Sequence, residues 1–149
     1  MTDNSGKTGM AIGETDDPTA IIETYYAAAA ITKGDPVYLS AAETVTAAAA
    51  VKDCIGVAVK TQTTVGGTVP VLVKGRVKVA AGGAITIGKA VYGADSSQRV
   101  LMQTDVSQAV NEAGSATYTV AVPFAQKLGK ALQAAGGTPG DLIFIDVGA

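Results

Sequence analysis

The sequence predicts a mainly β fold arranged as a compact barrel with an internal pseudo-repeat, and two observations carry this prediction. Valine alternates with other side chains, several of them long and polar, from Val69 to Val79, which is the period of a strand with one buried face. The octapeptide at 31–38 returns at 85–92 with five of eight positions identical. Two related β units in one small domain favour a barrel with pseudo-twofold symmetry, because closure removes exposed sheet edges.

The repeat continues downstream of the two octapeptides. Residues 55–58 (Ile-Gly-Val-Ala) are echoed by 128–131 (Leu-Gly-Lys-Ala), and 67–73 by 140–147. The second copy is longer by about 19 residues, and the extra length falls at about 103–119. We predict a surface loop there, with a short helix at 106–113.

Two positions decide the local details of the predicted strands. Gly75 interrupts the valine alternation, which predicts a bend or bulge in that strand. Residues 123–136 fit a helix, because Phe124 and Leu128 share a helical face and Gly136 follows the end. The repeat instead pairs this segment with a strand, so we predict strand for 127–133 and keep the helix as the alternative.

The N-terminus differs in character from the rest of the chain. Residues 1–24 contain five acids and one base, a net charge of −4, whereas 25–149 carry eight acids and ten bases. The polar stretch at the start buries too little apolar area to offset its ordering entropy. We therefore predict a flexible acidic arm at 1–24 and a single β domain at 25–149. About 20 extended residues span roughly 65 Å, enough to reach a neighbouring subunit.

The composition excludes many kinds of chemistry. The 149 residues include no His, no Trp and one Cys, so His-based catalysis, imidazole metal sites and thiolate clusters are ruled out. Cys54 has apolar neighbours and is predicted to be a small buried core residue in a reducing compartment. No window of 18 apolar residues exists, so no membrane partner is expected.

The remaining motifs favour no catalytic, cofactor or metal site. Gly6-Lys7-Thr8 lacks the earlier glycine of a phosphate-binding loop, since Met1 stands at that position. Asp16 and Asp17 are the only adjacent carboxylates, which more often means solvated charge than a cation site. The basic excess of the body is too small, and too free of aromatics, for nucleic-acid binding.

Two groups of residues are candidates for contacts with other subunits. Lys74, Arg76 and Lys78 fall on one face of a strand. They form either a solvated face or a surface for an acidic partner, such as this chain's arm from a neighbouring subunit. Tyr25 and Tyr26 follow the arm directly, and they serve either as interface anchors or as core residues.

The order of motifs resembles the capsid cement, or head decoration, proteins of tailed bacteriophages. The motifs are Ile-Thr-x-Gly-Asp-x-Val (31–37), Asp-x-Ile-Gly-Val-Ala (53–58), the valine-rich strand (69–79), Ile-Thr-x-Gly-x-x-Val-Tyr (85–92), Leu-Gly-x-Ala-Leu (128–132) and Gly-Asp-Leu-Ile-x-Ile-x-Val (140–147). The resemblance implies a β-barrel or β-tulip-like domain that trimerises on the outer surface of the head. After synthesis in the host cytoplasm, such a protein stabilises the major capsid protein shell.

This resemblance makes the expected function structural, with no enzymatic activity and no cofactor. The candidate subunit or capsid contacts are Asp16, Asp17, Ile21, Ile22, Tyr25, Tyr26, Lys74, Arg76 and Lys78. The expected partners are the major capsid protein and further copies of the chain, as a homotrimer. The alternative is a small-ligand- or carbohydrate-binding β-clip module, because Ile-Thr-x-Gly-Asp also opens strands in such modules.

Overall fold

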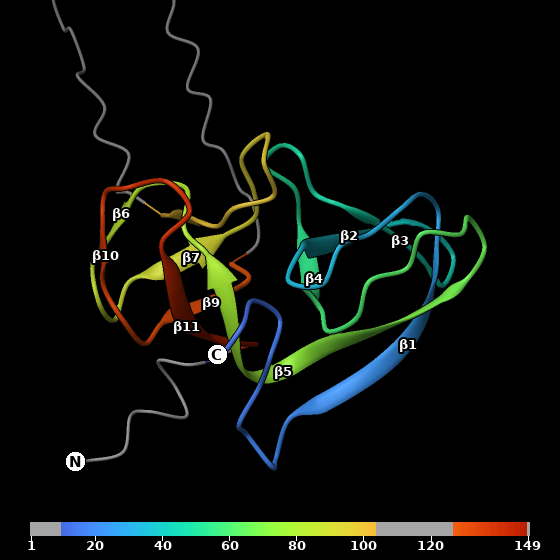
Figure 1. Ribbon diagram of the computed structural model, residues 1–149, viewed down its shortest axis with the longest axis horizontal. Coiled ribbons are helices and arrows are strands. Elements are labelled where there is room, and N and C mark those ends of the chain that lie inside the picture. The colour runs from blue at the N-terminus through green and yellow to red at the C-terminus, as the bar shows by residue number, and fades with distance from the viewer. Residues whose placement is uncertain (1–9, 104–126, 149) are drawn as a thin grey trace, which may run out of the picture.

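The computed structural model describes residues 10–103 and 127–148, and this part of the chain contains strands and no helix. Figure 1 shows two lobes joined by one long strand, β5. The strands are β1 (Ile21–Ala27), β2 (Pro36–Ala41), β3 (Thr44–Ala47), β4 (Cys54–Ala58), β5 (Thr68–Ala80), β6 (Ala84–Ile85), β7 (Ala90–Tyr92), β8 (Leu101–Met102), β9 (Gly129–Ala131), β10 (Ala135–Gly136) and β11 (Leu142–Val147). The predicted mainly β fold is therefore confirmed.

Each lobe is a small ring of strands. The main sheet has the order β1-β3-β2-β4-β5-β11-β9-β7-β8, and β1 also pairs with β5. The first five strands in this order therefore close into a barrel. In the second lobe, an isolated bridge between Ala81 and Val100 links the end of β5 to the start of β8, completing a similar ring. A separate two-stranded sheet of β6 and β10 belongs to this second lobe.

The order of the strands is equivalent in the two units, which confirms the internal repeat. Strands β3, β2 and β4 lie on one side of β5 in the order that β8, β7 and β9 follow beside β11. Equivalent backbone hydrogen bonds recur as well. The amide of Gly34 donates to the carbonyl of Ala58 at 2.7 Å, and that of Gly88 donates to Ala131 at 2.8 Å. Each copy of the repeat thus forms its own ring, and the two rings share β5.

Strand β5 belongs to both copies of the repeat. Its first half pairs with β1 and β4, and its second half pairs with β11. The offset of 54 residues that aligns the octapeptides also aligns β1 with the second half of β5. The contacts agree, because the amide of Ala27 donates to Gly67 and that of Ala81 donates to Asp141. One strand therefore ends the first unit and begins the second.

The change of partners along β5 occurs at Gly75, where the sequence predicts a bend or bulge. Gly75 has a φ of 121°, and the β1–β5 register shifts between Ile21 and Ile22. A Cβ at Gly75 would lie 3.0 Å from both the Cα of Ala20 and a carboxylate oxygen of Asp17. Glycine is required there by its conformational freedom and by the close approach of the segment that precedes β1. The strand is thus irregular close to the predicted position, with Val73 as the extra residue of the register shift two positions before Gly75.

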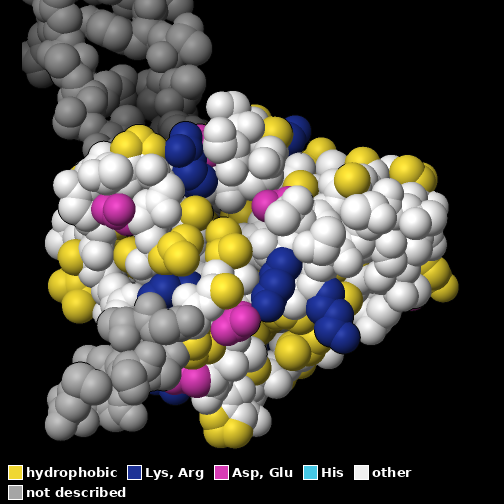
Figure 2. Space-filling model, in the orientation of Figure 1, with side chains coloured by type: hydrophobic (Ala, Val, Ile, Leu, Met, Phe, Trp, Pro, Cys, Tyr) yellow, Lys and Arg dark blue, Asp and Glu magenta, His cyan; other side chains and the backbone are white. Residues whose placement is uncertain are grey.

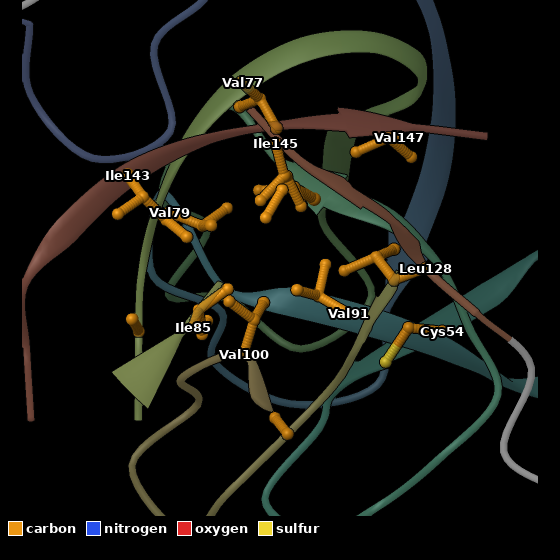
Figure 3. Close-up of a cluster of buried hydrophobic side chains, with 14 of the residues drawn as sticks. Cys54, Val77, Val79, Ile85, Val91, Val100, Leu128, Ile143, Ile145 and Val147 are labelled. Atoms are coloured by element: carbon orange, nitrogen blue, oxygen red, sulfur yellow. The ribbon is translucent and has the colours of Figure 1, made fainter. Parts of the chain in front are cut away.

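Each ring has its own hydrophobic core, and the two cores correspond position by position. The first contains Ala27, Ile31, Val37, Val45, Ala58, Val69 and Val71. Their counterparts in the second are Ala81, Ile85, Val91, Val100, Ala131, Ile143 and Ile145. Figure 3 shows this second core, with labelled side chains from β5, β7 and β11 converging. The second core also includes Val57 and Leu72 of the first unit, which join the two lobes.

The segment with two competing interpretations is a strand where the structure describes it. Strand β9 (Gly129–Ala131) lies within the predicted strand at 127–133 and pairs with both β7 and β11. The prediction from the repeat is confirmed there, and the helical alternative is wrong for this part. The predicted surface loop at 103–119 and its helix at 106–113 lie, apart from Gln103, outside the described residues.

Cys54 is buried in the second core, as the sequence predicts. Burial, with a smaller contribution from the charge of Asp53, raises the pKa of its thiol to about 12. Because the thiolate is the reactive form, we expect Cys54 to react with a thiol reagent at pH 8 at least about 100-fold more slowly in the folded than in the unfolded chain. The labelling rate is measured with a thiol reagent whose product absorbs light, in the presence and absence of urea. Equal rates would contradict the burial of Cys54.

Candidate interaction surface

The described part of the arm, residues 10–20, lies along the chain's own β5. The amide of Gly13 donates to the carbonyl of Lys78 at 2.7 Å, and the amide of Lys78 donates to the carbonyl of Glu14 at 3.0 Å. Strand β1 begins at Ile21, so the last four residues of the predicted arm belong to a strand. The segment from Gly13 onward and β1 thus follow the same strand, β5, one after the other.

Charged side chains reinforce this contact. The guanidinium of Arg76 lies 3.4 Å from a carboxylate oxygen of Asp16, and the backbone amide of Arg76 donates to Asp17 at 3.2 Å. Farther along the arm, the ammonium of Lys33 donates to Glu14 at 3.2 Å. The predicted pairing of acidic arm and basic strand is therefore present, although it forms within one chain. An exchange of arms between subunits stays a prediction.

A pair of glycines allows the arm to approach this closely. A Cβ on Gly13 would meet the backbone of Gly34, and a Cβ on Gly34 would overlap the side chain of Ile12. Both glycines also have positive φ values, 78° and 95°. The contacts of Gly34 and Lys33 with the arm could not be predicted from the sequence. The sequence contained one relevant signal, the recurrence of Gly34 as Gly88 in the repeat. The turn that each of these glycines occupies is enough to explain that recurrence.

Acid is expected to release the arm from β5. A hydrogen bond from Lys33 lowers the pKa of Glu14 below its ordinary 4.5. Bonds from Thr19, and then one from the Arg76 amide, lower the pKa of Asp17 below 3.8. The Thr19 bonds lie within the arm, whereas the contacts of Lys33 and Arg76 join the arm to the domain. These two contacts therefore stabilise the bound arm above the ordinary carboxyl pKa values and are lost as the pH falls through the lowered ones.

Nuclear magnetic resonance of the Gly13 and Arg76 amides from about pH 6 to about pH 2.5 measures this release. We expect a transition with a midpoint below the ordinary carboxyl values. Asp17→Asn should weaken the docked state at neutral pH, and Asp141→Asn, a change to a carboxyl with no resolved contact to the arm, serves as the control. Resonances that stay constant across this range would contradict the role of these carboxylates.

Lys78 departs from the expected solvated face. Its side chain is only 5% exposed, and its ammonium lies 4.7 Å from the centre of the Phe144 ring, on the paired strand β11. Burial lowers the pKa of Lys78. The solvated-face interpretation is therefore wrong for this residue, whereas Lys74 on the same strand is exposed. The negative face of the Phe144 ring attracts the ammonium, which helps to explain how a lysine is accommodated here.

The predicted anchor residues on β1 remain largely uncovered. Ile21 and Ile22 are each 47% exposed, and Tyr26 is 50% exposed. Tyr25 packs partly against the first core, and its hydroxyl donates to Glu23 at 2.7 Å. Tyr25 thus fits the core alternative, whereas the interface role of Tyr26 stays a prediction. The candidate contacts separate into a group held against the arm and a group of exposed apolar residues on β1.

Within the described residues, no group of three or more Cys, Asp or Glu side chains is placed to hold a metal ion. The described segments also include no helix long and apolar enough to cross a membrane. On the face shown in Figure 2, acidic and basic side chains are interspersed among uncharged ones, without a broad field of one sign.

The comparisons with known proteins agree with the motif order. The sequence matches the model of the phage cement protein family over residues 18–138, which span most of both rings. The fold is similar to the crystal structure of the head fiber gp8.5 N base in bacteriophage phi29. The TM-score is 0.54 at 16% identity, over 87% of this chain and 94% of that one. No curated protein matches the sequence significantly. The chain belongs to the phage cement protein family, and it is a capsid-associated structural protein of the virion.

Proposed function

We propose that this chain binds the outer surface of the major capsid protein shell as a homotrimer and stabilises the shell, without any catalytic role. The observation that carries this proposal is the family match, which extends over most of both rings rather than a single motif. Cement proteins act as many copies on a symmetric shell. A modest free energy at each site is therefore sufficient for a large total effect.

The architecture suits a protein that must resist deformation. Two fused rings with matched cores and a shared central strand leave few ways to bend one lobe against the other, since Val57 and Leu72 of the first unit are packed in the second core. Binding by a pre-organised domain loses little conformational entropy. Most of the interaction free energy with the shell then remains available to stabilise it.

The residues also support a role without catalysis. The sequence contains no His, and its single thiol, Cys54, is buried with a pKa raised to about 12. A thiol in this state is a poor nucleophile at neutral pH. Non-enzymatic action therefore stays part of the proposal, alongside trimerisation.

Capsids that lack the cement protein test the proposed function. Purified protein is mixed with such capsids, pelleted, and the bound fraction and the temperature of shell disruption are measured. We expect saturable binding to the outside and a higher disruption temperature. Sedimentation equilibrium of the free protein should give three times the chain mass of 14.8 kDa. Failure to bind would overturn the function, and a monomer at micromolar concentration would overturn the trimer in solution.

A further inference from the structure

The outer edge of β1 lacks a described partner along most of its length. The amide of Tyr26 donates to the carbonyl of Glu43, so it points away from β5. Because alternate residues of a strand direct their amides to the same edge, the amides of Ile22 and Thr24 also point away from β5. Strand β3 pairs with β1 only at Tyr26 and Ala27. Among the described residues, none bonds to the outward groups of Ile22 and Thr24.

The internal repeat shows what such an edge does elsewhere in this fold. The 54-residue offset places Ile22 at the position of Arg76 and Thr24 at that of Lys78. In the second unit, this edge is occupied by an extended segment: the amide of Lys78 donates to the carbonyl of Glu14, and that of Arg76 donates to Asp17. The same edge is therefore occupied by the arm in one unit, through the Glu14 carbonyl and the Asp17 carboxylate, and it lacks a described partner in the other.

The side chains at the open edge differ from those at the filled edge in polarity and in charge. Arg76, which pairs with the acidic arm, is replaced by the exposed Ile22. Glu23 accepts a hydrogen bond from the Tyr25 hydroxyl, and the carbonyl of Glu43 accepts one from the Tyr26 amide, so two acidic residues flank this part of β1. The open edge thus favours an extended segment with an apolar side chain and a neighbouring basic side chain, and it disfavours an acidic one.

We propose that the edge of β1 from Ile21 to Thr24 binds an extended segment of the capsid shell as an added strand. In this arrangement an apolar side chain of the shell covers Ile22, and a basic side chain lies beside Glu23 and Glu43. Backbone hydrogen bonds supply affinity, and the side chains supply selectivity. The proposal rests on the proposed function, because it assigns the shell as the occupant.

The β1 strand of a second copy fits the edge less well. Antiparallel pairing of β1 with the β1 of another copy is symmetric, so it would bring the Glu23 carboxylates of the two copies to the same seam. Like charges placed across a strand pair are destabilising. A cement protein must contact the shell, and β1 carries three of the exposed large apolar side chains of the described residues, namely Ile21, Ile22 and Tyr26.

Two variants and a matched control test the site on capsids that lack the cement protein. Ile22→Lys places a charge at the expected apolar contact, and Thr24→Pro removes an amide that points away from β5 while leaving the bonds to β5 in place. Ile87→Lys makes the same change at an isoleucine that is 62% exposed in the second unit. We expect the affinity for capsids to fall by roughly tenfold or more for the first two variants and to stay unchanged for the control.

Hydrogen exchange of the full chain gives a readout that a folding defect cannot imitate. In the free wild-type protein the amides of Ile22 and Thr24 should exchange quickly, whereas those of Glu23 and Tyr25, which face β5, exchange slowly. On capsids, the two fast amides should slow by about tenfold or more. The amides of Arg76 and Lys78, already bonded to the arm, should not change.

The outcomes separate the two proposals. Binding of the wild-type protein together with normal binding of Ile22→Lys and Thr24→Pro, or unprotected Ile22 and Thr24 amides, would overturn the strand-addition site and leave the cement function intact. Absence of wild-type binding would overturn the function itself. Protection of these amides by self-association in free protein, lost in Ile22→Lys, would assign the edge to a second copy and contradict the shell as occupant.

Discussion

Replacing Gly129 with alanine is expected to lower the free energy of unfolding by at least about 2 kcal/mol. A Cβ at this position would overlap the carbonyl oxygen of Asp146 on the neighbouring strand β11. The oxygen belongs to backbone in a paired strand, so the overlap is relieved only by separating β9 from β11. Gly56, the counterpart of Gly129 in the first unit, faces the carbonyl of Leu72 in the same way. Gly56→Ala should therefore have a similar effect.

Urea denaturation of both variants measures these losses, and the chain offers a matched control. A Cβ at Gly83 has no atom within 4 Å, and its φ is not in the left-handed region. Gly83→Ala should leave stability unchanged or raise it by up to about 1 kcal/mol, because it reduces the entropy of the unfolded chain. A neutral effect of Gly129→Ala would contradict the close approach of β9 and β11.

The isoleucines that open the two octapeptides should carry comparable shares of stability. Ile31 is 1% exposed and Ile85 is 2% exposed, each in the core of its own ring. Truncation to alanine removes buried methyl and methylene groups and leaves a cavity, which costs about 2–5 kcal/mol. We expect both Ile31→Ala and Ile85→Ala to lower the midpoint of urea denaturation substantially and by similar amounts.

Ile87→Ala is the control for these truncations, because Ile87 is largely exposed and should change stability by less than about 0.5 kcal/mol. Fluorescence of the tyrosines and circular dichroism should report the same transition, since β5 links the two rings. A large loss of stability for one variant and none for the other would show that the two cores do not contribute equally, contrary to what their matched residues imply.

The fold could be predicted from the sequence wherever a pattern was local. The valine alternation of β5, the unusual backbone of Gly75 and the burial of Cys54 all follow from side-chain period, backbone freedom and apolar neighbours. The strand at 127–133 required the repeat, because its own residues also fit a helix. Comparison with 55–58 was correct since both segments must contact the last strand of their unit closely, which only glycine allows.

The sharing of β5 could not be predicted in the same way. Residues 21–27 and the second half of β5 occupy equivalent places, yet their sequences agree only at the final alanine of the aligned stretch, Ala27 and Ala81. One segment faces an open edge and the other a docked arm, so different side chains are required. Pairing between strands far apart in sequence depends on tertiary contacts that local period does not encode.

The candidate surface was predicted in part. Complementary charges indicated that an acidic arm meets a basic strand, but charge alone does not say whether Asp16 and Arg76 meet within one chain or between two. Alternation placed Lys78 on a polar face, yet this residue is buried and its ammonium lies over the ring of Phe144 on β11. The exposure of Ile22 depends on which strands pair with β1, which no local sequence pattern indicates.

A reconstruction by electron cryomicroscopy of capsids incubated with this protein tests the central claim most directly. The account predicts added density on the outer surface, shaped as pairs of fused rings in groups of three, with β1 turned toward a strand of the shell. Capsids with unchanged outer density at saturating protein would contradict the assignment of this chain as a cement protein that binds and stabilises the shell.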